Sequence, residues 1–114
     1  MELRITHNGL RITDEQREFC ERRLRFALSR FALRLERVEA VFSDANGPKG
    51  GHDVVCCLLI GLRGAEDVVV RDVGESVEAV MAGAADRAAR TVARRLQRRV
   101  DQRRLSRPDA AVRL

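Results

Sequence analysis

The chain has 114 residues, of which 45% are apolar, 22 are basic and 17 are acidic, giving a formal net charge of +5. This length suits one globular domain, and the apolar fraction argues against a disordered chain. No apolar run approaches the roughly 20 residues that span a bilayer. The N-terminus MELRITHNG lacks a secretory signal. We therefore expect a cytoplasmic protein without membrane contact, and the positive charge favours an anionic partner.

A strand followed by a helix is predicted at the N-terminus. Residues 2–6 alternate with Leu3 and Ile5 on one side, as in a half-buried strand. Thr13 begins a capping box that ends at Gln16, so a helix is expected from about residue 14 to 31 or slightly beyond. Its apolar stripe comprises Cys20, Leu24, Ala27, Leu28 and Phe31.

Three further strands are predicted in the middle of the chain, over residues 38–43, 53–62 and 67–72. The Gly-rich segment 44–51 reads as a turn, because it joins two strands and lacks the strand-to-helix context of a phosphate-binding loop. The middle strand contains VVCCLLI, which is apolar on both faces. If helices cover only one side of the sheet, its other apolar face is exposed or meets a partner.

Ser76 is expected to cap a second helix that ends near Gln102. Nine arginines lie between Arg87 and Arg107, with a single acid, Asp101, among them. At about 100° per residue, a row of arginines opposes an apolar stripe on this helix. The row comprises Arg87, Arg90, Arg94 and Arg98, and the apolar stripe comprises Val77, Met81, Ala84, Ala88, Val92 and Leu96.

The order β-α-β-β-β-α predicts an α+β fold, in which both helices pack on one face of a four-stranded, mostly antiparallel sheet. Residues 1–102 are expected to form one domain, and residues 103–114 a flexible basic tail. At about 1.5 Å per residue, the second helix is longer than the strands, so its C-terminal part should project past the sheet.

The first helix carries a second stripe, in which Phe19 and Phe26 alternate with Arg23 and Arg30, with Arg22 nearby. Such a mixture suits RNA, because arginines pair with phosphates and aromatic rings stack on bases. We nevertheless expect the two phenylalanines to fill the seam between the helices, since large apolar side chains are usually buried. The two arginines of the stripe should face the arginine row of the second helix. The expected nucleic-acid-binding residues are Arg22, Arg23, Arg30, Arg87, Arg90, Arg94, Arg95 and Arg98.

Catalytic and metal chemistry are not predicted. His7 and His52 are isolated, and the three cysteines lack metal-ligand spacing. Cys56 and Cys57 are neighbours in a strand and point to opposite faces, so all three thiols are expected to be free and buried. No nucleophile and base can be paired, so neither enzyme activity nor a cofactor is expected.

Three segments carry a resemblance to a known family: LRITHNGLRITDEQREFCERRLRFALSRF, SDANGPKGGHDVVC and DRAARTVARRLQRR. The first contains an Ile-Thr strand end, a Thr-Asp helix cap and an aromatic residue before Glu21-Arg22-Arg23-Leu24. The second is similar to a Gly-Pro-Gly-Gly loop. Together they resemble the ribosome hibernation-promoting factor / ribosome-associated inhibitor A family, also called sigma-54 modulation proteins, over residues 1 to about 100.

The resemblance implies the same β-α-β-β-β-α fold and binding to the small ribosomal subunit, in the channel used by messenger and transfer RNA. It implies that translation is inhibited and idle ribosomes are preserved. Arg23, Arg87, Arg90 and Arg94 match basic family positions and would contact ribosomal RNA. Glu78 and Ala82 stand where the family often has Tyr and Asp. The chain has no room for the C-terminal domain of long members, so it resembles a short form.

Two other functions fit the same residues. A general binder of double-stranded RNA or DNA would dock its basic helices on a duplex by shape. A protein-interaction module would instead use the bare face of the sheet. A homodimer through this face would be centred on Val55, Cys57 and Leu59.

Overall fold

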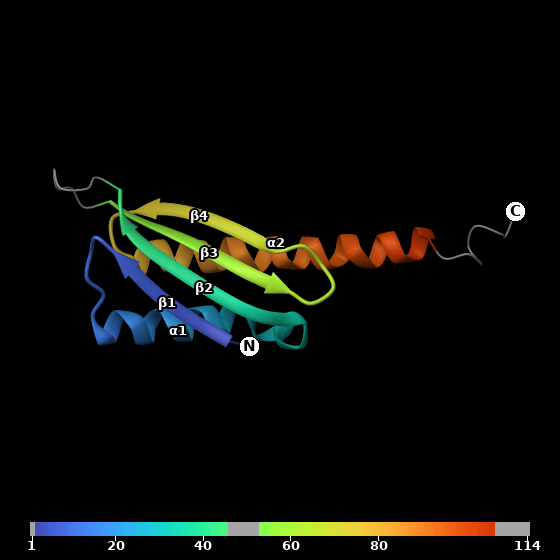
Figure 1. Cartoon of the computed structure of the whole chain (residues 1–114), viewed down its shortest axis with the longest axis horizontal. Coiled ribbons are helices and arrows are strands. Elements are labelled where there is room, and N and C mark those ends of the chain that lie inside the picture. The colour runs from blue at the N-terminus through green and yellow to red at the C-terminus, as the bar shows by residue number, and fades with distance from the viewer. Residues whose placement is uncertain (1, 46–52, 107–114) are drawn as a thin grey trace, which may run out of the picture.

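The computed structural model describes residues 2–45 and 53–106, and it confirms the predicted order of elements (Figure 1). The elements are β1 (Glu2–Asn8), α1 (Asp14–Leu28), the 3₁₀ helix η1 (Ser29–Arg34), β2 (Leu35–Asp44), β3 (Val54–Leu62), β4 (Val68–Gly74) and α2 (Val77–Ser106). The Gly-rich turn and the end of the basic tail lie mostly outside the described residues, so the predicted domain limits stay a prediction.

The four strands form one sheet in the order β1-β2-β3-β4. β1 pairs with β2 in parallel, because α1 crosses between them and returns the chain to the same end of the sheet. The β2–β3 and β3–β4 pairs are antiparallel. The sheet is therefore mixed and mostly antiparallel, as predicted.

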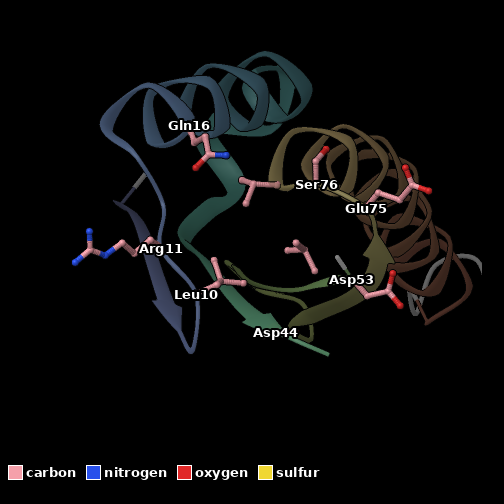
Figure 2. A pocket seen from close by; sticks show the side chains of 9 residues that line it. Leu10, Arg11, Gln16, Asp44, Asp53, Glu75 and Ser76 are labelled. Carbon is pink, nitrogen blue, oxygen red and sulfur yellow. The ribbon is translucent and has the colours of Figure 1, made fainter. Parts of the chain in front are cut away.

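Both helices lie on the same side of the sheet (Figures 1 and 2). α1 contacts β1, while α2 contacts β3 and β4. On β3, Cys56, Leu58 and Ile60 are fully buried under the helices, whereas Cys57 and Leu59 are half-buried on the opposite face. The predicted division of this strand into two apolar faces is confirmed.

The helix starts follow the predicted caps. Thr13 Oγ1 accepts a hydrogen bond from the Gln16 N–H at 3.1 Å, and Gln16 Oε1 accepts one from the Thr13 N–H at 3.0 Å. Ser76 Oγ accepts from the Ala79 N–H at 3.1 Å. These side chains satisfy N–H groups that have no partner within the first turn of a helix.

The helix ends differ from the prediction. α1 stops at Leu28, and the chain continues to Arg34 as a 3₁₀ helix, a tighter winding that is frequent at helix C-termini. α2 continues to Ser106, four residues past Gln102, through residues that favour helix formation. In Figure 1 its C-terminal part extends beyond the strands, as its predicted length required.

The three thiols are free, but only two are fully buried. Burial raises the pKa of Cys20 to about 11, with a smaller contribution from the carboxylate of Glu78. Burial likewise raises the pKa of Cys56 to about 12, with a further contribution from Cys20. The expectation that every thiol is buried is wrong for Cys57, which is half-buried on the uncovered face of the sheet.

Replacement of Leu58 by Ala should lower the free energy of unfolding by roughly 2–5 kcal/mol, because it leaves a cavity in the packed core. Leu33→Ala is the matched control, since Leu33 is 87% exposed, and it should change stability by less than about 0.5 kcal/mol. Urea denaturation followed by circular dichroism measures both. Equal effects would contradict the position of the core.

Labelling with a thiol-specific disulfide reagent at pH 8 should modify Cys57 first. The thiolate is the reactive form, and the raised pKa values keep Cys20 and Cys56 protonated until the pH approaches about 11. Cys57→Ser should remove the fast phase, and denaturant should restore full labelling of the other two. Fast labelling that persists in Cys57→Ser would contradict this assignment.

Candidate nucleic-acid interface

Helices α1 and α2 run parallel and side by side, and both begin at the same end of the molecule (Figure 1). Near that end, Gln16 Nε2 donates to Glu78 Oε1 at 3.3 Å. About two turns further along each helix, the Arg23 guanidinium donates to Asp86 Oδ1 at 2.9 Å. Two polar bridges therefore link the neighbouring helices.

Three arginines of the predicted row point into solvent. Arg90, Arg94 and Arg98 are exposed on α2. Within the described residues, the one hydrogen bond from these side chains runs from Arg94 to Thr91 Oγ1 at 3.4 Å, and no acid lies within ion-pair distance of them. Their guanidinium groups are therefore available to an anionic ligand.

The arginines of α1 and η1 fall into two groups. Arg22 is exposed, and Arg30 is exposed with its guanidinium 4.6 Å from the centre of the Phe31 ring. Arg23 faces α2, as expected, but its side chain is only 26% exposed because it pairs with Asp86. The Arg23 side chain thus links α1 to α2 through its ion pair with Asp86, and a ligand would have to compete with this pair.

Two predicted binding residues donate hydrogen bonds to the sheet, although Arg87 is exposed and only Arg95 is half-buried. Arg87 Nη1 donates to the carbonyl of Arg71 on β4 at 2.9 Å. Arg95 Nη1 donates to the carbonyls of Glu66 and Asp67 at 3.1 and 2.9 Å, and it lies 3.6 Å from the Glu66 carboxylate.

The sequence held a signal for the position of Arg95. It follows Ala88 by seven residues and Val92 by three, which places it on the same side of the helix as the apolar stripe. An arginine on that side reaches the β3–β4 turn once the helix packs on the sheet. The prediction placed Arg95 among the outward-facing arginines because of its residue type and not because of its position on the helix.

The predicted burial of Phe26 is wrong, since this side chain is 78% exposed. Leu24 and Leu28 are fully buried, and each is two residues from Phe26. Two residues correspond to about 200° around a helix, so Phe26 must point away from the core. Phe19 is half-buried and packs against the core, as expected. Phe19, Arg22, Arg23 and Phe26 together line a shallow depression of about 250 Å³.

A second depression, of about 320 Å³, lies where the helices begin (Figure 2). Its lining includes three acids, Asp44, Asp53 and Glu75, together with Arg11 and with Ser76 at the start of α2. Acids are favourable at a helix N-terminus, where the peptide dipoles leave partial positive charge. Among the described residues no His, Cys, Asp and Glu side chains cluster as a metal site. With three acids and one arginine in its lining, this depression is less suited to a polyanion than the faces of the helices that carry exposed arginines.

The face of the sheet away from the helices carries an apolar patch. Val41, Val69 and Val73 are exposed there, and Val69 is the most open at 68%. Cys57 and Leu59 lie half-buried between them, but Val55 is only 6% exposed. A homodimer through this face stays a prediction, and its contacts would centre on the exposed valines more than on Val55.

The family model described as sigma 54 modulation protein / S30EA ribosomal protein matches residues 3–104. The chain belongs to this family. The resemblance to hibernation-promoting factors is thereby confirmed, and this S30EA-family chain is a ribosome-associated protein of the hibernation and modulation class. Neither helix, over the part of the chain with assigned structure, is long and apolar enough to cross a membrane.

Two solved structures show the same fold as this S30EA-family chain. The Protein Y N-terminal domain of Thermus thermophilus is 23% identical with a TM-score of 0.68, covering 82% of this chain and 98% of its own. A ribosomal subunit interface protein from Coxiella burnetii is 12% identical with a TM-score of 0.69, covering 82% and 96%. A comparison with curated proteins gives no match.

Replacement of Arg95 by Ala should destabilise this S30EA-family protein by about 1–2 kcal/mol, because two carbonyls of the β3–β4 turn lose a charged donor. Arg98→Ala removes an exposed arginine one turn later on the same helix and should leave stability within about 0.5 kcal/mol. Urea denaturation separates the two variants. Equal stability would show that the Arg95 contacts contribute nothing to the fold.

Proposed function

We propose that this protein binds the small ribosomal subunit through ribosomal RNA phosphates, and that binding inhibits translation and promotes ribosome hibernation. In this proposal the protein acts by binding and not by catalysis, and it acts in the cytoplasm. The observation that carries the proposal is a set of outward-facing arginines on α1, η1 and α2, hereafter the arginine surface. It comprises Arg22, Arg30, Arg90, Arg94 and Arg98.

The chemistry of the arginine surface fits RNA phosphates. A guanidinium is always charged, and its planar donors match two phosphate oxygens at once. Arg90 and Arg98 are about 12 Å apart along α2, at roughly 1.5 Å per residue. A row of this length contacts several phosphates of one backbone. Each neutralised phosphate releases counterions, so binding should weaken steeply with salt.

Arg23, Arg87 and Arg95 take a different part in this proposal. Each already makes hydrogen bonds within the protein, to Asp86, to β4 and to the β3–β4 turn respectively. A phosphate would have to share or replace these partners. Their main contribution is therefore to hold the helices and sheet so that the arginine surface keeps its shape.

The relatives support a ribosomal site. One structural neighbour is described as a ribosomal subunit interface protein, and the family description includes a ribosomal protein. The choice of the small subunit follows from the resemblance of Arg90 and Arg94 to basic family positions. A general duplex binder would use the same arginines, so competition with naked duplex RNA must separate the two functions.

Arg90→Glu combined with Arg94→Glu should reduce co-sedimentation with small subunits by at least tenfold in affinity, because two attractive contacts become repulsive. Arg63→Glu combined with Arg71→Glu is a control with the same charge change. Both control residues are exposed away from the helices, in the β3–β4 turn and on the uncovered sheet face. The control should bind nearly as well as the unaltered chain.

Three results decide the matter. Equal loss in both variants would reduce the proposal to a net-charge effect. Displacement of the unaltered chain by excess duplex RNA would favour a general duplex binder. Binding that both resists the duplex and is lost in the helix variant supports the small subunit as the partner, and an in vitro translation assay then tests inhibition.

A further inference from the structure

We infer that Phe26 is a stacking platform for one unpaired RNA base, with Arg22 binding the adjoining phosphate. This inference rests on the proposed function and names the part of the RNA that the α1 surface recognises. The platform is the depression lined by Phe19, Arg22, Arg23 and Phe26.

The ring of Phe26 is exposed although its neighbours could have covered it. Arg30, four residues on, lies over the ring of Phe31. Arg23, three residues before, is held against α2 by Asp86 at 2.9 Å. Of the three arginines that lie three or four residues from Phe26, two are therefore engaged elsewhere, the third is the exposed Arg22, and the phenylalanine side chain stays 78% exposed.

Single exposed apolar residues are common and need no function. Phe26 differs in its setting, because the depression beside it is lined by two phenylalanines and two arginines and by no acid. Phe19 anchors the base of this depression, since it is half-buried and packs on the core. An aromatic face bordered by guanidinium groups is the arrangement that binds unpaired bases by stacking and cation–π contact.

The charge of this region selects RNA over an apolar protein segment. Arg22 and Arg25 on α1 and Arg30 on η1 are exposed around Phe26. The acids nearest in sequence, Glu18 and Glu21, lie one to two turns before Phe26, and Asp86 of α2 is already paired with Arg23. An apolar protein segment would bury these cations without a compensating charge, which is costly. A nucleotide brings a flat base for the ring and a phosphate for Arg22.

A duplex hides the faces of its bases, so the platform requires a single-stranded or flipped base. This requirement separates the inference from the binding of the arginine surface, which needs only phosphates. The region of ribosomal RNA under α1 is therefore expected to contain at least one unstacked nucleotide, whereas the region under α2 can be fully paired.

Phe26→Trp gives a direct optical test, because the chain contains no Trp and no Tyr. The new indole would be the sole strong fluorophore, and stacking on a base quenches it. A short single-stranded oligoadenylate should quench the emission. A perfectly paired RNA duplex of equal length should bind through the arginines without comparable quenching. Equal quenching by the duplex overturns the inference.

Affinity for small subunits gives a second test with matched variants. Phe26→Ala and Phe26→Leu should each weaken binding roughly 5- to 150-fold, the range expected for loss of one stacked base. Phe26→Trp should bind like the unaltered chain. Leu33→Ala is the control, since Leu33 is exposed but lies outside the depression. Circular dichroism should show every variant folded.

The outcomes distinguish failure of this inference from failure of the proposed function. If the unaltered chain binds small subunits and Phe26→Ala binds equally well, the platform is wrong while the ribosomal function stands. If Phe26→Leu binds normally and Phe26→Ala does not, the contact is apolar packing against protein, and stacking is overturned. If the unaltered chain does not bind ribosomes but single-stranded RNA quenches the fluorescence of the Phe26→Trp variant, the stacking platform is supported and the ribosomal function is not.

Discussion

The burial of the apolar stripe of α2 is the constraint on which the rest of the surface depends. Met81, Ala88 and Val92 are fully buried, and the helix contacts β3 and β4. This packing fixes the rotation of the helix about its own axis. Arg90 and Arg94 then face solvent, because any rotation that turned them inward would bury unpaired charge. The burial of the apolar stripe and the exposure of the arginines therefore require the same rotation of α2 about its axis.

A single residue type performs two tasks on this helix, and position decides which. Arg87 and Arg95 reach back to carbonyls of β4 and of the β3–β4 turn, where a long side chain with several donors satisfies exposed backbone groups. Arg90, Arg94 and Arg98 have no such backbone within reach among the described residues. The arginines that hold the fold and those offered to a ligand are thus interspersed along one helix, and mutating them as a group would confuse stability with binding.

Much of the fold could be predicted because periodicity reports burial directly. The faces of β3, the cap at Thr13 and the stripe of α2 all followed from the spacing of apolar and capping residues. The end of α1 could not, since α and 3₁₀ windings bury similarly spaced residues. The partner of each arginine depends on tertiary register, which spacing does not contain. Phe26 is a different case. Its position two residues from both Leu24 and Leu28 indicated an exposed side chain, whereas the prediction of burial relied on the apolar character of phenylalanine.

The parallel alignment of α1 and α2 has a consequence for how the protein meets its partner. The side-chain charges are divided along the common axis of the helices: carboxylates such as Glu75 and Glu78 lie where the helices begin, and the exposed arginines of α2 lie towards its end. These full charges outweigh the parallel helix dipoles, which leave partial positive charge at the start of a helix and partial negative charge at its end. A molecule with separated charge experiences a torque in the field of a polyanion. It would turn its arginine-rich end forward during diffusion, so that a larger share of random collisions arrive in a productive orientation.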